Sequence, residues 1–103
     1  MEKRILQVNF SYNVPRMDYE RAVSPLADKF AAVPGLIWKV WIIDEDKSEA
    51  GGIYFFDSES SMKTYLEGEL ATAVINHPAL SEFSVKQFEI MDEITAITRG
   101  PIK

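Results

Sequence analysis

Two kinds of hydrophobic spacing follow one another along the chain, and their order predicts the fold. Apolar side chains recur at every second position, the spacing of a β-strand, in residues 4–12, 36–44, 51–57 and 82–91. Residues 18–33 and 58–76 instead carry apolar side chains every three or four positions, as the buried stripe of an amphipathic helix does. The order β-α-β-β-α-β predicts the α+β ferredoxin-like fold, an antiparallel sheet with the helices on one face.

Local signals predict where the two helical segments begin and break. Asp18 is a candidate N-cap of the first helix. Pro25 lies inside that helix and predicts a kink, or a second helix start with Ser24 as its cap. Gly68 predicts a break in the second helix. No linker interrupts the pattern, so residues 1–103 are expected to form a single domain.

The middle strands are apolar on both faces, although helices can cover only one face of such a sheet. Trp38 and Trp41 lie three positions apart and therefore point to opposite faces, and residues 53–56 are apolar at every position. Exposing several such side chains would leave an adhesive surface. We therefore expect a homodimer in which two sheets pack together as a dimeric α/β barrel. The tail, residues 92–103, could cap an edge or pack on the partner.

Composition narrows the classes of partner. Lys and Arg total 11 against 16 Asp and Glu, a formal net charge of −5, which disfavours nucleic acid and anionic membranes as ligands. The chain has no cysteine, which excludes disulfides, thiolate catalysis and Cys-ligated metals. No apolar run approaches the roughly 20 residues of a membrane span, and the first residues have no signal-peptide core. These features predict a cytoplasmic protein.

Two stretches of sequence carry a resemblance to a known family. Residues 34–41 read PGLIWKVW and residues 49–54 read EAGGIY, with SPLA earlier at residues 24–27. The chain resembles the YdhR family of proposed mono-oxygenases, within the dimeric α/β-barrel superfamily, over nearly its whole length. The resemblance implies a ferredoxin-like protomer, a homodimer and an oxygenase acting on small aromatic or quinol-like substrates.

An oxygenase without a cofactor uses a deprotonated aromatic substrate as the electron donor to oxygen. It needs an apolar pocket, hydrogen-bond donors for the substrate oxygen, and exclusion of water. The candidate catalytic residues are Asn9, Trp38 and Tyr54. The candidate substrate-binding residues are Gln7, Trp41, Gly51, Gly52, Phe56 and His77. We expect neither a cofactor nor a metal, because the chain has one histidine and neither a GxGxxG motif nor a P-loop.

Each candidate also has a purely structural interpretation. Asn9 could bond a neighbouring group, both tryptophans could serve packing, and the hydroxyl of Tyr54 could lie at a rim. The glycine pair at residues 51–52 could follow from hairpin geometry alone. Lys39 and Glu49 could form a base and acid at the rim of the pocket, or they could be edge charges that prevent strand-to-strand aggregation. His77 could be a solvated helix end.

Three other functions stay open at this point. A haem-binding or haem-degrading protein of the same superfamily would use Asn9 and His77, but Phe56 stands where those proteins have a tryptophan. A dimer that binds a small molecule without turning it over would need the same pocket. A protein with no pocket at all would have only a structural role. Whether the chain is an enzyme is therefore undecided by its sequence.

Overall fold

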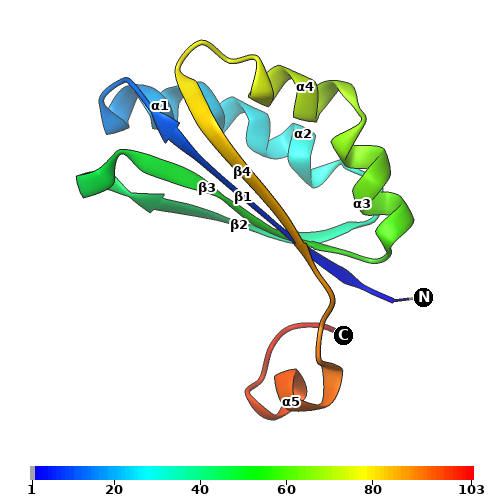
Figure 1. Ribbon diagram of the computed structural model, residues 1–103. Helices are drawn as coiled ribbons and strands as arrows, with labels where there is room; N and C mark the ends of the chain where they lie inside the picture. Colours follow the sequence, from blue (N-terminus) through cyan, green and yellow to red (C-terminus); the bar gives the residue numbers. More distant parts are fainter. Residues whose placement is uncertain (1) are drawn as a thin grey trace.

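Four strands form one antiparallel sheet in the order β2-β3-β1-β4, which confirms the predicted ferredoxin-like fold (Figure 1). The computed structural model describes residues 2–103. The strands are β1 (Arg4–Tyr12), β2 (Leu36–Asp44), β3 (Glu49–Phe56) and β4 (Leu80–Phe88). β1 and β3 occupy the centre, so each pairs on both sides, whereas β2 and β4 form the edges.

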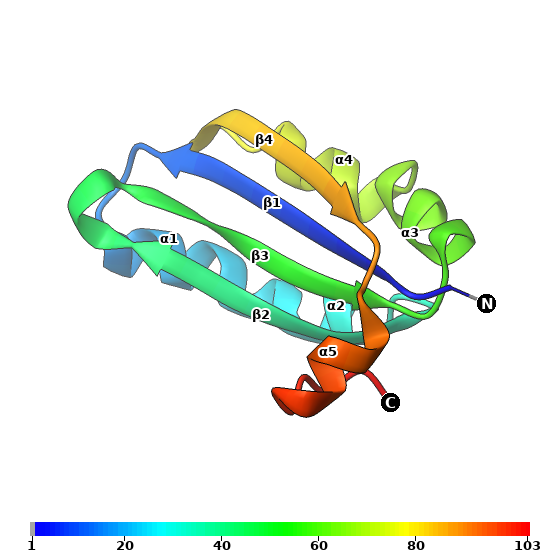
Figure 2. The same ribbon diagram turned by 60° about the horizontal axis from the view of Figure 1, so that its bottom comes forward.

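The helices of both crossovers cover one face of this sheet (Figure 1). They are α1 (Arg16–Val23), the 3-10 turn η1 (Ser24–Leu26), α2 (Ala27–Ala31), α3 (Glu59–Leu66) and α4 (Glu69–Ile75). A last helix, α5 (Asp92–Ile97), lies on the opposite side of the sheet beside the C-terminus (Figures 1 and 2). The two faces of the sheet therefore have different coverings.

The first crossover breaks where Pro25 predicts, but its capping differs from the prediction. Pro25 lies in η1, which separates α1 from α2. The prediction of Ser24 as a cap is wrong, because its hydroxyl donates to the carbonyl of Glu20 at 2.6 Å. The prediction of Asp18 as N-cap is also wrong: Pro15 holds that position, and Asp18 lies in the first turn. There its carboxylate still faces the positive end of the helix dipole.

The second crossover follows the expected pattern more closely. Gly68 separates α3 from α4, as predicted. Ser58 caps α3, since its hydroxyl oxygen accepts the backbone N–H of Ser61 at 3.1 Å. β4 begins at Leu80, two residues earlier than its alternation indicates, because Glu82 has a positive φ of 56° and interrupts the period-two pattern.

Aromatic side chains fill the space between the sheet and the helices. The strands contribute the buried residues Leu6, Val8, Phe10, Tyr12, Tyr54 and Phe56. The helices contribute Tyr19, Phe30, Met62, Tyr65 and Ala71. Tyr54 contacts rings on both sides, with its centroid 6.0 Å from that of Phe30 and 5.3 Å from that of Tyr65. This layer is the hydrophobic core.

The C-terminal tail covers one end of the opposite face. Trp38 lies against Phe55 with ring centroids 5.2 Å apart, and its indole N–H donates to the carbonyl of Pro101 at 2.9 Å. The ammonium of Lys3 donates to the carbonyl of Ile102 at 2.6 Å. Phe55 is fully buried as a result, whereas Val40 on the same face stays half exposed. The tail thus caps part of this face and leaves the rest open.

Gly51 is required where β3 passes β1. A methyl group at this position would overlap the carbonyl oxygen of Val8. We expect Gly51→Ala to lower the free energy of unfolding by roughly 2–4 kcal/mol, the range of substitutions that force the backbone apart. Gly68→Ala is the matched control, because its nearest non-neighbour atom would lie 3.3 Å away, and it should cost less than about 1 kcal/mol. Equal urea midpoints for the two variants would contradict this account.

Candidate functional site

A small chamber lies between the sheet and the helices near the β2 edge. Its volume is about 170 Å³ and its walls are mainly aromatic and aliphatic. The side chains that give it chemical character are Tyr19, Phe30, Lys39, Trp41, Tyr54 and His77. We call this space the aromatic chamber. It matches the apolar pocket with few polar groups that an oxygenase or a small-molecule binder needs.

A groove of about 370 Å³ between α1 and β2 adjoins the aromatic chamber. Chamber and groove share Tyr19, Val23 and Trp41 as lining residues, and Trp41 is 39% exposed. At the outer side of the groove, the guanidinium of Arg16 pairs with Glu20 at 2.7 Å. A molecule larger than the chamber could therefore place one ring inside and extend past Trp41 into the groove.

Lys39 places its amine among three aromatic rings. Its Nζ lies 3.4 Å from the ring centroids of Phe30 and Trp41 and 4.6 Å from that of Tyr54. Phe30 and Trp41 meet edge to face, with an interplanar angle of 85°. Across residues 2–103, no carboxylate lies within ion-pair distance of this amine. Lys39 as a residue is half-buried, but its amine lies over aromatic rings and is not an edge charge in water.

Burial decides the protonation of Lys39. Removal from water disfavours the ammonium and lowers the pKa of Lys39 from 10.5 to about 7. The ring faces attract the cation and act in the opposite direction. Gly52, on the neighbouring strand, makes room for this side chain, because a methyl group there would lie 2.6 Å from Cε of Lys39. The amine is thus shared between its neutral and charged forms near neutral pH.

The tyrosines around the amine keep their protons. The hydroxyls of Tyr54 and Tyr65 share a buried hydrogen bond of 3.1 Å. Burial raises the pKa of both, and it raises the pKa of Tyr19 to about 12. The hydroxyl of Tyr54 is therefore an interior group and not a rim group. These phenols can donate hydrogen bonds but cannot act as bases at neutral pH.

His77 lines the aromatic chamber from the turn between α4 and β4. Its Nδ1 accepts the backbone N–H of Ala79 at 3.1 Å. A neutral imidazole with an acceptor at Nδ1 carries its proton on Nε2. His77 can therefore offer a hydrogen-bond donor to a ligand, and it stabilises the turn as well.

Asn9 and Gln7 lie on the opposite face of the sheet from the chamber. The amide nitrogen of Asn9 donates to the carboxylate of Glu49 at 3.1 Å, and its amide oxygen accepts from Gln7 at 3.1 Å. Ser11 follows them on the same face of β1. This chain of polar side chains satisfies itself, as a half-buried amide must. The haem hypothesis places Asn9 and His77 around one ligand, and the sheet separates them.

The remaining candidates also divide between the two faces. Trp38 lies against the tail on the face of the sheet opposite the helices, which we call the open face. Trp41 lies on the face that the helices cover, as the spacing of the two residues predicts. Phe56 is fully buried in the core and packs parallel to Tyr54, with centroids 6.1 Å apart. Gly51 lines the chamber through its backbone. One pocket thus gathers Trp41, Gly51, Tyr54 and His77 but not Asn9, Gln7 or Trp38.

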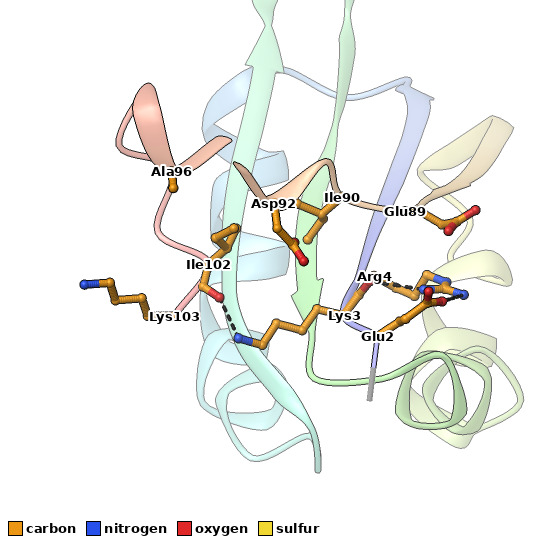
Figure 3. Close-up of a pocket in the computed structure, with 9 residues that line it drawn as sticks. All are labelled: Glu2, Lys3, Arg4, Glu89, Ile90, Asp92, Ala96, Ile102 and Lys103. Atoms are coloured by element: carbon orange, nitrogen blue, oxygen red, sulfur yellow. Dashed lines mark hydrogen bonds and ion pairs between the residues drawn. The ribbon is translucent and has the colours of Figure 1, made fainter. Parts of the chain in front are cut away.

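A second hollow of about 460 Å³ lies between the tail and the start of β1 (Figure 3). Charged side chains of both signs surround it, and some of them pair with one another or with the backbone. Arg4 contacts Glu2 at 3.1 Å, and Lys3 reaches across the hollow to the carbonyl of Ile102 (Figure 3). This hollow is the seam along which the tail docks, and it lacks the apolar walls expected of an aromatic-binding pocket.

Sequence reasoning did not predict the unusual environment of Lys39. It offered Lys39 as a base at the rim of the pocket or as an edge charge, and it assigned Phe30 only to a helix stripe. The available signal is the alternation in β2, which puts Lys39 on the same face as Trp41 and Ile43. Lys39 pairs with Tyr54 and Trp41 pairs with Gly52, so this row sets Lys39 beside Trp41 without showing which face meets the helices.

A family model described as "Putative mono-oxygenase ydhR" matches residues 5–101. The chain belongs to this family. The match covers the sheet, apart from Arg4 at the start of β1, and the helices of both crossovers. No curated protein matches the chain.

Several solved structures share the fold of this YdhR-family chain. SnoaB, a cofactor-independent oxygenase from Streptomyces nogalater, is 18% identical with a TM-score of 0.68, over 85% of this chain and 92% of SnoaB. A dimeric ferredoxin-like protein from Thermobifida fusca is 20% identical with a TM-score of 0.67, over 87% and 93%. The ActVA-Orf6 monooxygenase of Streptomyces coelicolor, solved with nanaomycin D, is 14% identical with a TM-score of 0.64, over 86% and 88%. At these identities the likeness shows the fold.

Two further observations concern residues 2–103. No helix there has the length and the hydropathy that a membrane span needs. This range also contains no group of three or more histidine, aspartate or glutamate side chains that could hold a metal ion.

The buried amine makes the stability of the protein depend on pH. Between pH 7 and 10.5 the folded state binds fewer protons at Lys39 than the unfolded state does, so the free energy of unfolding should rise with pH. The slope approaches about 1.4 kcal/mol per pH unit. Above pH 10 the raised pKa of Tyr19 opposes this trend, because unfolded tyrosines ionise first.

Urea denaturation at pH 7, 8 and 9 tests this dependence. Lys39→Met keeps the length of the side chain and removes the titration, so the difference in stability between wild type and variant should shrink steadily from pH 7 to pH 9. Parallel curves for the two proteins would show that Lys39 titrates normally.

Proposed function

We propose that the chain is a cofactor-independent mono-oxygenase whose aromatic chamber binds a ring of a small phenolic or quinol-like substrate. The observation that supports this proposal best is the chamber itself, a space of about 170 Å³ with aromatic walls, which Tyr19, Lys39, Tyr54 and His77 help to line. Membership of the YdhR family supports the reaction class. The fold shared with SnoaB and ActVA-Orf6 is consistent with it.

The size of the site favours a substrate with more than one ring. Ligand pockets commonly have volumes of about 300–1,000 Å³, and the chamber alone is smaller. The adjoining groove of about 370 Å³ brings the combined space into that range. The oxidised ring would lie in the chamber, and the rest of the molecule would extend past Trp41 along α1.

The proposed reaction needs only the substrate and molecular oxygen. A phenolate transfers an electron to O₂, the two radicals combine into a carbon–oxygen bond, and the resulting peroxide loses water to give a quinone. One oxygen atom enters the product and the other becomes water, so a phenol and O₂ yield a quinone and H₂O. The protein's part is to ionise the phenol, hold it flat between rings and exclude water.

Two other functions are outcomes of the tests below. A haem-binding protein would shift the Soret band of hemin at a 1:1 ratio, but the separation of Asn9 from His77 gives that function no observed support. A small-molecule binder without turnover would show a raised melting temperature with the ligand and no product.

We also propose that two copies form a homodimer through the open face of the sheet. Val40 of β2 and Phe88 of β4 are 50% and 47% exposed on that face. The tail beside it adds Met91, Ile94 and Ile97, which are all more than half exposed. A face with this many exposed apolar side chains is typical of an association surface. The dimeric ferredoxin-like protein of the same fold is consistent with this arrangement.

Oxygen uptake tests the proposed reaction. We expect at least one member of a panel of hydroquinones, naphthols and anthrones to consume O₂ faster with the protein than in buffer, with one O₂ used per substrate. Ala73→Phe adds a ring at a residue that lines the chamber and should lower the rate at least about tenfold, equivalent to about 1.4 kcal/mol. Thr72→Phe changes the neighbouring residue on α4, which does not line the chamber, and should not lower the rate. A rate that survives Ala73→Phe would place the reaction elsewhere.

Light scattering tests the dimer. Val40→Lys puts a charge on the open face and should convert the dimer to a monomer at micromolar concentration, because burying an unpaired ammonium is unfavourable. Ile75→Lys is the matched control, since Ile75 is 53% exposed on α4, on the helix side of the sheet. A wild-type monomer at these concentrations, or equal masses for the two variants, would contradict the proposed interface.

A further inference from the structure

We propose that the amine of Lys39 accepts the hydroxyl proton of an acidic phenol or enol in the aromatic chamber and then holds the oxyanion as its counter-ion. This inference rests on the proposed function, because it assigns the base and the substrate class of the same site. In this step the substrate O–H bond breaks, its electron pair stays on oxygen, and a new N–H bond forms at Nζ. The ammonium later protonates the peroxide oxygen, which leaves Lys39 neutral again.

The position of the amine suits this role. Nζ lies within 3.4 Å of two ring centroids and lines the chamber, so a hydroxyl on a ring held there can approach it. Lys39 makes no ion pair within residues 2–103. Its lone pair, when the amine is neutral, is therefore available to a ligand.

The other polar side chains that line the chamber are either phenols or already hydrogen-bonded. Tyr54 is hydrogen-bonded to Tyr65, and burial raises the pKa of Tyr19, so neither phenol ionises near neutral pH. His77 already accepts a backbone N–H at Nδ1. α2 contributes Phe30 to the chamber and no charged side chain. By elimination, Lys39 is the base that faces a bound substrate.

The surroundings also favour the product of the proton transfer. An isolated buried ammonium is unfavourable, but an oxyanion beside it would replace the lost hydration of both ions. The faces of Phe30, Trp41 and Tyr54 stabilise the cation further. The pKa of Lys39, lowered to about 7 by burial, makes the amine a competent base at neutral pH. A neutral aromatic ring without an acidic hydroxyl could not form this ion pair with the ammonium.

The binding of 2-naphthol under argon tests the proposal without any oxygenation. This probe keeps its hydroxyl proton in water at pH 8, and its absorption moves to longer wavelength on ionisation. With wild-type protein at pH 8 we expect the naphtholate band to appear at one probe per chain, with no proton released to an unbuffered solution. With Lys39→Met the probe should bind in its neutral form and show no such band.

Lys39→Arg tests whether residue 39 accepts the proton or only stabilises the naphtholate by a permanent positive charge. Arginine stays charged at pH 8, so it should produce the naphtholate band while releasing one proton per bound probe. Gly52→Ala displaces Cε of Lys39 without removing the amine, and it should weaken the band by at least about half. Identical bound spectra for wild type and Lys39→Met would overturn the proposal, as would the absence of any naphtholate with wild-type protein at millimolar probe.

The oxygen-uptake assay keeps the two proposals distinguishable. A naphtholate band without oxygen uptake on any substrate would uphold Lys39 as the base of a binding site and contradict the mono-oxygenase. Oxygen uptake that persists in Lys39→Met would uphold the mono-oxygenase and contradict the role of Lys39.

Discussion

The apolar character of both faces of strand β3 is the constraint from which the rest of the structure follows. Tyr54 and Phe56 require cover on one face, and Phe55 requires it on the other. Fully burying one such ring contributes roughly 1.5–3 kcal/mol, so neither face is stable against water. The helices of the two crossovers cover the first face. The tail covers Phe55 through Trp38 on the second, and it does not extend to Val40 or Phe88.

The aromatic chamber is a consequence of how the first face is filled. Flat rings that meet edge to face, as Phe30 and Trp41 do, leave gaps that aliphatic side chains would close. Glycine at position 52 removes one more side chain from the same layer. The amine of Lys39 occupies part of the resulting space. A site built in this way is held by core packing and not by loops, so its geometry should be rigid.

Period-two alternation predicts the strands because the alternation of side chains between two faces is a local property of an extended backbone. All four strands, the break at Pro25 and the break at Gly68 could be located from sequence. The N-cap of α1 could not, because Asp18 and Pro15 are both compatible with a helix start and backbone geometry decides between them. The predicted start of β4 lies two residues too late, because the positive φ of Glu82 interrupts the alternation near the beginning of the strand.

The candidate site was less accessible to sequence reasoning, for a physical reason. A strand that is apolar on both sides does not reveal which side meets the helices, so the alternation in β2 puts Lys39 with Trp41 but leaves their destination open. β1 is more informative: Leu6 and Phe10 mark its buried face, and Asn9 must then point away. The sequence therefore contained the argument that separates Asn9 from the chamber, while the environment of Lys39 depends on contacts with α2.

Lys39 is not the residue that would make the fold most stable at this position. An apolar side chain of equal length would fill the same space between the rings without the desolvation of an amine. Gly52 adds a second cost to stability. Glycine inside a strand has low β propensity and no side chain to pack, but here it leaves room for the side chain of Lys39. Two adjacent departures from the most stable choice, both directed into one enclosed space, are typical of a functional site and not of a core. Packing alone explains Phe56 and Met62, but it does not explain the amine.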